Sequence, residues 1–193
     1  MDAPHLLTAM ISTGTVAIAE IGDKTQLLAL LLAARFRRPW PIVAGILVAT
    51  LLNHALAAWL GARGAAWLQP GTLRWIVAAS FLAIAAWTLK PDKLDASDEQ
   101  LPARGAFIAT MIAFFIAEIG DKTQVATVLL AARYQPLWEV IAGTTVGMLL
   151  ANVPVVALGS RFADRLPLRA ARYVAATVFL GLAAWVAMRG LGG

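Results

Sequence analysis

The heptapeptide EIGDKTQ occurs twice in the chain, at Glu20–Gln26 and again at Glu118–Gln124. Each copy places two carboxylates, a lysine, a threonine and a glutamine in the middle of an otherwise uncharged stretch. That stretch runs from Leu6 to Ala34 in the first case and from Gly105 to Ala132 in the second. A charge at the centre of a membrane is unfavourable by roughly 2.5 to over 10 kcal/mol. A sequence that repeats the same charged residues at that depth is expected to use them.

The composition indicates a helical membrane protein. Of the 193 residues 60% are hydrophobic and 14% are charged, whereas soluble domains carry about 25% charged residues. The apolar residues form long blocks, as in polytopic membrane proteins. The chain contains no cysteine, which excludes disulfides and thiolate metal sites. Its net charge of +5 comes from basic residues in short loops between apolar blocks, so the charge does not indicate nucleic-acid binding.

Six membrane spans are predicted, at Leu6–Ala34, Pro41–Leu60, Leu73–Leu89, Gly105–Ala132, Leu137–Leu158 and Ala170–Met188. Most of them suit a hydrocarbon core about 30 Å thick. The first and fourth are too long for one straight span, since a helix of about 29 residues rises about 43 Å. Strong tilt is one explanation. A break at Gly22 and Gly120 is the preferred one, because glycine tolerates the backbone conformations that a break needs.

The chain is an internal repeat with an offset of 98 residues. Glu20–Arg35 and Glu118–Arg133 are identical at 12 of 16 positions, and matches continue as far as Trp87 and Trp185. We therefore predict an all-α integral membrane protein made of two three-helix repeats, residues 1–90 and 105–193, joined by a polar linker at 91–104.

An odd number of spans in each half makes the two halves inverted repeats, an architecture that recurs in secondary transporters with the substrate site at the repeat interface. On this topology ten basic residues lie on the side of the central linker and four on the other side. In membrane proteins, basic residues are enriched in the cytoplasmic loops. The linker is therefore predicted to be cytoplasmic and both termini to lie outside.

The acids of the two motifs are predicted to bind a cation. If the motifs meet at the repeat interface, four carboxylates and two ammonium groups have a formal charge of −2, which one divalent cation or two protons would neutralise. Burial and mutual repulsion favour protonation of some of these acids. A structural alternative is a pair of buried ion pairs at i,i+4 spacing within each motif, which would leave one aspartate in each motif unexplained. The predicted metal ligands are Glu20, Asp23, Glu118 and Asp121, with charge balance from Lys24 and Lys122.

The other polar side chains near the motifs are oxygen ligands or hydrogen-bonding groups. Carboxylates, hydroxyls and amides are hard ligands that suit Mn²⁺, Ca²⁺ or Mg²⁺, and the scarcity of histidine disfavours zinc and copper. Amides in the second and fifth spans are equally consistent with interhelical hydrogen bonds. Candidates for secondary ligands or gating residues are Thr25, Thr123, Gln26, Gln124, Asn53 and Asn152. His54, which matches Asn152 in the repeat, is a further candidate for proton relay.

The duplicated signature E-x-G-D-[KR]-[TS], here at Glu20–Thr25 and Glu118–Thr123, resembles that of the GDT family of cation/proton antiporters, which includes the MneA-type bacterial manganese exporters. The resemblance covers the whole chain. It implies a multi-pass protein of the plasma (inner) membrane that exports a divalent cation, Mn²⁺ with Ca²⁺ as the alternative, in exchange for H⁺. It also implies that the four motif acids bind the ion, and that the ion is cargo rather than a cofactor.

Two other classes of function are compatible with paired acids in a membrane. A divalent-cation channel would use the same ligands. An intramembrane enzyme would use them to activate water, but the chain has no HExxH motif. The duplication of the motif favours two alternating gates over a single active site, and hence a transporter that is not an enzyme. The sequence carries no information on oligomeric state.

Overall fold

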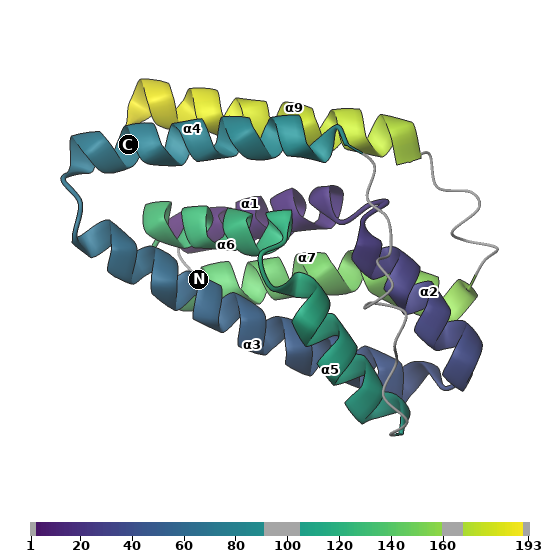
Figure 1. The fold of residues 1–193 in the computed structure, drawn as a ribbon. Helices are drawn as coiled ribbons and strands as arrows, with labels where there is room; N and C mark the ends of the chain where they lie inside the picture. The colour runs from purple at the N-terminus through teal and green to yellow at the C-terminus, as the bar shows by residue number, and fades with distance from the viewer. Residues whose placement is uncertain (1–2, 91–104, 160–167, 191–193) are drawn as a thin grey trace.

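The computed structural model describes residues 3–90, 105–159 and 168–190, and every regular element in these ranges is an α-helix (Figure 1). The helices are α1 (Ala3–Ala19), α2 (Lys24–Phe36), α3 (Pro39–Ala66), α4 (Pro70–Thr88), α5 (Ala106–Glu118), α6 (Lys122–Arg133), α7 (Leu137–Leu158) and α9 (Leu168–Arg189). The linker at 91–104 lies outside the described residues.

The preferred break in the first and fourth predicted spans is confirmed. Helix α1 ends directly before Glu20 and α2 begins directly after Asp23, while α5 ends at Glu118 and α6 begins directly after Asp121. Gly22 and Gly120 have φ angles of 80° and 75°, a left-handed conformation that glycine adopts without a steric penalty. The glutamate and aspartate of a motif therefore do not share one helix face, as they would on a continuous helix.

Four helices are long and apolar enough to cross a membrane, namely Pro39–Ala66, Pro70–Thr88, Leu137–Leu158 and the Arg172–Arg189 part of α9. They coincide with the second, third, fifth and sixth predicted spans. The segments that lead into the two breaks, Leu6–Ala19 and Ala106–Glu118, are shorter apolar helices. Large apolar side chains also cover the outside of the bundle, as in Trp40, Trp67 and Leu150. This surface suits a lipid environment.

The two halves of the chain are packed into each other. Helix α1 lies along α7, α5 and α6 lie along α3, and α4 pairs with α9 (Figure 1). The α4–α9 pair also packs against α1 and α6, whereas α2 and α5 slope away from it on the far side of the breaks. The motifs lie at the two bends, so this packing determines how their side chains meet.

Glycines allow the helices of the two halves to approach closely. A Cβ on Gly45 would lie 2.8 Å from the Phe107 carbonyl oxygen, and one on Gly143 would lie 2.6 Å from that of Ala9. The four residues are related by the 98-residue offset, so the same contact is made twice. At Gly61 the approach is closer still, because a Cβ would lie 2.1 Å from the Val128 carbonyl oxygen on α6.

We expect Gly61→Ala to lower the melting temperature of the purified protein in detergent, because the added methyl group would force α3 away from α6. Overpacking of this kind is destabilising by about 1–3 kcal/mol. The matched control is Gly64→Ala on the same helix, where a Cβ meets nothing within 4 Å. That change should leave the melting temperature unchanged or raise it, since alanine is a better helix former than glycine. Equal melting temperatures for the two variants would contradict the close approach.

Candidate functional site

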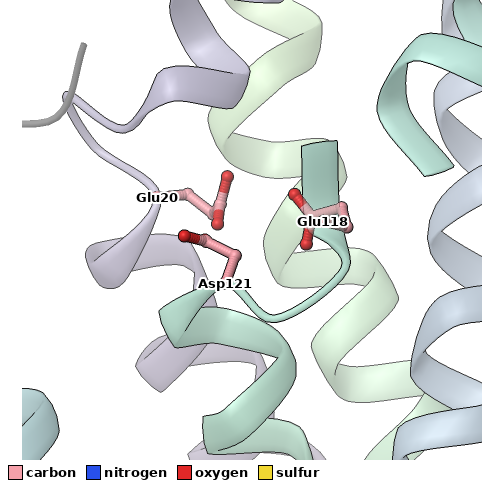
Figure 2. Close-up of side chains that lie close together, drawn as sticks. All are labelled: Glu20, Glu118 and Asp121. Atoms are coloured by element: carbon pink, nitrogen blue, oxygen red, sulfur yellow. The ribbon is translucent and has the colours of Figure 1, made fainter. Parts of the chain in front are cut away.

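Three carboxylates from the two motifs meet at the bends of the broken helices. Glu20 directly follows α1, Glu118 ends α5 and Asp121 precedes α6, and one oxygen of each lies within 4.8 Å of the others (Figure 2). Glu20 and Glu118 are fully buried and Asp121 is 4% exposed. Buried charges of one sign are stable only when a cation or a proton compensates them. These three residues, called the acidic triad below, are the one group of three or more His, Cys, Asp or Glu side chains among the described residues that could hold a metal ion.

Threonines from the first turn of α2 and α6 hold the triad in place. The Thr25 hydroxyl donates a hydrogen bond to Oε2 of Glu20. The Thr123 hydroxyl lies 3.2 Å from Oε2 of Glu118 and 3.3 Å from Oδ2 of Asp121, so its one proton serves either acid. The second oxygen of each glutamate, Oε1, is buried without a hydrogen-bond partner among the described residues. Each glutamate therefore presents one braced oxygen and one oxygen available to a ligand.

Asp23, the fourth predicted ligand, forms an ion pair across the repeat. Its Oδ1 lies 3.0 Å from Nζ of Lys122, and both side chains are buried. Oδ1 also accepts a hydrogen bond from the backbone N–H of Lys24. The structural alternative placed Lys122 in an ion pair within its own motif. Lys122 instead forms an ion pair with Asp23 of the other motif. The structure brings three of the four predicted acids together and places the fourth against a lysine.

Lys24, the repeat counterpart of Lys122, is in a different environment. Its side chain is half-buried, whereas that of Lys122 is buried. Each lysine interacts electrostatically with the glutamate of the opposite motif, Lys24 with Glu118 and Lys122 with Glu20. Lys24 therefore offsets part of the negative charge of the triad from its edge.

The glutamines of the two motifs stabilise the breaks. The side-chain oxygens of Gln26 and Gln124 accept hydrogen bonds from the N–H groups of Gly22 and Gly120, at 2.8 and 2.7 Å. Their amide groups donate to the opposite half of the chain. Gln26 donates to the Ala151 carbonyl at 2.9 Å, and Gln124 donates to Oδ1 of Asn53 at 3.4 Å. Because their oxygens are engaged, both glutamines act as braces for the bends in this structure.

The polar residues of α3 and α7 approach the site to different degrees. Nδ2 of Asn152 lies 3.5 Å from Oε2 of Glu20 and 3.1 Å from the Met148 carbonyl, so it borders the triad. Asn53 donates to the Phe115 carbonyl at 3.1 Å and accepts from Gln124, so it supports the second bend. His54 is fully buried, and neither ring nitrogen has a hydrogen-bond partner among the described residues.

One feature of the site could not be read from the sequence. The spacing of residues within a motif indicates which side chains are neighbours on a helix, but not which residues pair between two motifs. The Asp23–Lys122 contact joins residues 99 positions apart. The duplication of the motif indicated that such a contact could form. It did not indicate which of the two equivalent pairs, Asp23–Lys122 or Asp121–Lys24, is present.

Comparison with known proteins gives one family. A family model described as "Divalent cation/proton antiporter GDT1" matches the chain over residues 8–96 and 106–193. A protein of Vibrio cholerae named "Putative manganese exporter" is 58% identical over 181 residues, which cover 93% of this chain and 90% of that protein.

More distant relatives share the same family name. A GDT1-like protein of Synechocystis is 26% identical over 76% of this chain and 80% of its own length. A GDT1-like protein of Arabidopsis thaliana is 25% identical over 93% of this chain and 70% of its own length. No solved structure matches the chain.

The family model matches both halves of the chain, each with its own EIGDKTQ motif and its own bend. The family is one of transporters and not of enzymes. With its apolar helices, the chain is a multi-pass membrane protein. It belongs to the GDT1 family of divalent cation/proton antiporters.

Proposed function

We propose that this chain exports a divalent cation from the cytoplasm in exchange for H⁺, with Mn²⁺ preferred over Ca²⁺, and that the acidic triad binds the ion. The observation that carries the proposal is the meeting of Glu20, Glu118 and Asp121, buried and within 4.8 Å of one another. Buried oxygens without hydrogen-bond partners on both glutamates supply the coordination that a cation needs. The preference for Mn²⁺ rests on the name of the Vibrio cholerae relative, since carboxylate oxygens suit Ca²⁺ as well.

The charges of the described residues match the proposed exchange. In formal charges the triad contributes −3, Lys24 at its edge contributes +1, and the Asp23–Lys122 pair is neutral. The net charge of −2 is neutralised by one divalent cation or by two protons. A site that holds either the metal or the protons, but not both, has the chemistry of an antiporter.

The proposed architecture is a pair of inverted three-helix repeats, 1–90 and 105–193, in which each broken helix pair counts as one span. The repeated contacts at Gly45 and Gly143 and the equivalent braces at Gln26 and Gln124 support this arrangement. Broken helices that meet at a repeat interface are typical of secondary transporters, in which access alternates between the two sides. The distribution of basic residues supports an orientation with the central linker in the cytoplasm and both termini outside. The plasma (inner) membrane location is proposed from the similarity to the Vibrio cholerae protein named as an exporter.

Coupled transport is tested in proteoliposomes that contain the purified protein and a pH-sensitive dye. An imposed proton gradient should drive Mn²⁺ against its own concentration gradient, and Mn²⁺ movement should dissipate the proton gradient. Ca²⁺ and Mg²⁺ are compared under the same conditions. A channel would carry Mn²⁺ down its gradient only, so Mn²⁺ flux without proton flux would contradict antiport.

Neutral variants test the triad. Glu20→Gln, Glu118→Gln and Asp121→Asn should each reduce Mn²⁺ transport by about 100-fold or more, since the loss of a supporting residue around a metal alone reduces affinity 10–100-fold. The matched control is Glu139→Gln, another buried acid, which lies at the start of α7 and outside the triad. Correctly inserted Glu139→Gln protein should transport Mn²⁺ at the unmodified rate. Unmodified transport by a triad variant would remove the proposed site.

A further inference from the structure

The two identical motifs are in different states in this structure. The 98-residue offset relates the pair Asp23–Lys122 to the pair Asp121–Lys24. The first pair is formed, with 3.0 Å between Nζ and Oδ1. In place of the second, Asp121 is part of the acidic triad and Lys24 forms no ion pair with a described residue. Because the two heptapeptides have the same sequence, the motif sequence alone does not decide which of the two pairs forms.

The burial of side chains around the two bends also differs. Lys122 is buried and Lys24 is half-buried. Ile119 is 58% exposed, whereas its counterpart Ile21 is half-buried. The α4–α9 pair packs against α1 and α6, and the counterparts of these helices, α5 and α2, slope away from it (Figure 1).

Other contacts around the motifs obey the repeat. Gln26 and Gln124 brace their bends in the same way, and Gly45 and Gly143 make the same close approach. Thr25 and Thr123 each hydrogen-bond to the glutamate of their own motif. A largely repeated frame thus surrounds an asymmetric arrangement of two aspartates and two lysines, with the exception of Asn152, whose repeat counterpart is His54. Exchanging the roles of the motifs would produce a second arrangement with the same acids and lysines.

We propose that Lys24 and Lys122 are alternating counter-ions that decide which aspartate binds the transported cation. In the described state Lys122 holds Asp23 out of the site, and Asp121 joins Glu20 and Glu118. In the opposite-facing state Lys24 holds Asp121 and Asp23 joins the two glutamates. The cation is then bound by both glutamates and by one aspartate at a time. This inference rests on the proposed function, and it makes the two lysines positioning residues.

The exchange keeps the charge of the site constant. Each state has three acids in the site, one neutral aspartate–lysine pair and one lysine at the edge, so the net charge is −2 in both. In each state one aspartate is paired with a lysine and the other depends on the bound cation or protons, because a buried carboxylate without compensation is strongly destabilising. The same cation or the same two protons therefore balance both states.

The experiment compares two repeat-related variants, Asp23→Asn/Lys122→Gln and Asp121→Asn/Lys24→Gln. Each removes both partners of one pair, which leaves no isolated buried charge and preserves folding. Because the chain has no cysteine, a spin label attached to a single cysteine at position 21 or at position 119 reports the surroundings of each bend. The label's mobility is measured in lipid nanodiscs.

The two variants should give opposite patterns of label mobility. Asp121→Asn/Lys24→Gln removes the pair of the opposite-facing state, so a label at 119 stays mobile and a label at 21 stays restricted. Asp23→Asn/Lys122→Gln removes the pair of the described state, so the label at 21 becomes the more mobile one. If each label has the same mobility in both variants and in the unmodified chain, the proposed exchange of aspartates is wrong.

A milder variant provides a second readout. Lys24 is half-buried, so Lys24→Gln leaves the described state intact but deprives Asp121 of its partner in the opposite one. Mn²⁺ transport should fall by about 100-fold or more, as expected when a buried carboxylate loses its counter-ion. Mn²⁺ binding to the purified chain should not weaken, and Lys24→Arg should restore transport. Transport by Lys24→Gln at the unmodified rate would overturn the role of the lysine.

The failure of this inference is distinguishable from failure of the proposed function. If Glu20→Gln binds Mn²⁺ as tightly as the unmodified chain, the proposed site itself is wrong. If Glu20→Gln loses Mn²⁺ binding while the labels at 21 and 119 do not shift, the site stands and the exchange of aspartates is wrong.

Discussion

Repulsion among three buried carboxylates is the constraint on which the rest of the structure depends. Glu20, Glu118 and Asp121 lie within 4.8 Å of one another and have almost no contact with solvent. Such a cluster is stable only if protons or a cation neutralise it. The fold around it supplies two lysines, two threonines and an asparagine, but it leaves one oxygen on each glutamate for a ligand. This requirement for a cation or protons at the cluster is the physical basis of the proposed site.

The helix breaks make the cluster geometrically feasible. A continuous helix would place Glu20 and Asp23 on one face, and the two motifs would then meet as rigid rods. The left-handed glycines turn the chain between the acids, so that Glu20 and Asp121 face each other while Asp23 reaches Lys122. The glutamines satisfy the backbone N–H groups that each break exposes and tie them to α3 and α7. A bend braced in this way from the opposite half suits a site whose two sides must move relative to each other.

Much of this arrangement could be predicted from the sequence, because the information was local or repeated. The duplication, the length of the first and fourth apolar stretches and the glycine in each motif were enough to predict the broken helices. The four long helices coincide with four of the predicted spans, and the family was identified from the doubled signature. The pairing of Asp23 with Lys122 could not be predicted, because two copies of one heptapeptide offer two equivalent pairings. The glutamines were predicted as ligands or gating residues, but their oxygens accept from glycine N–H groups, a contact that depends on the exact turn of the backbone.

Anomalous diffraction from crystals of the protein grown with Mn²⁺ would show directly whether the triad binds the transported ion. One strong anomalous peak is expected between the carboxylates of Glu20 and Glu118, with Asp121 in the coordination sphere. A peak at the protein surface with none inside the triad would show that the ion binds elsewhere.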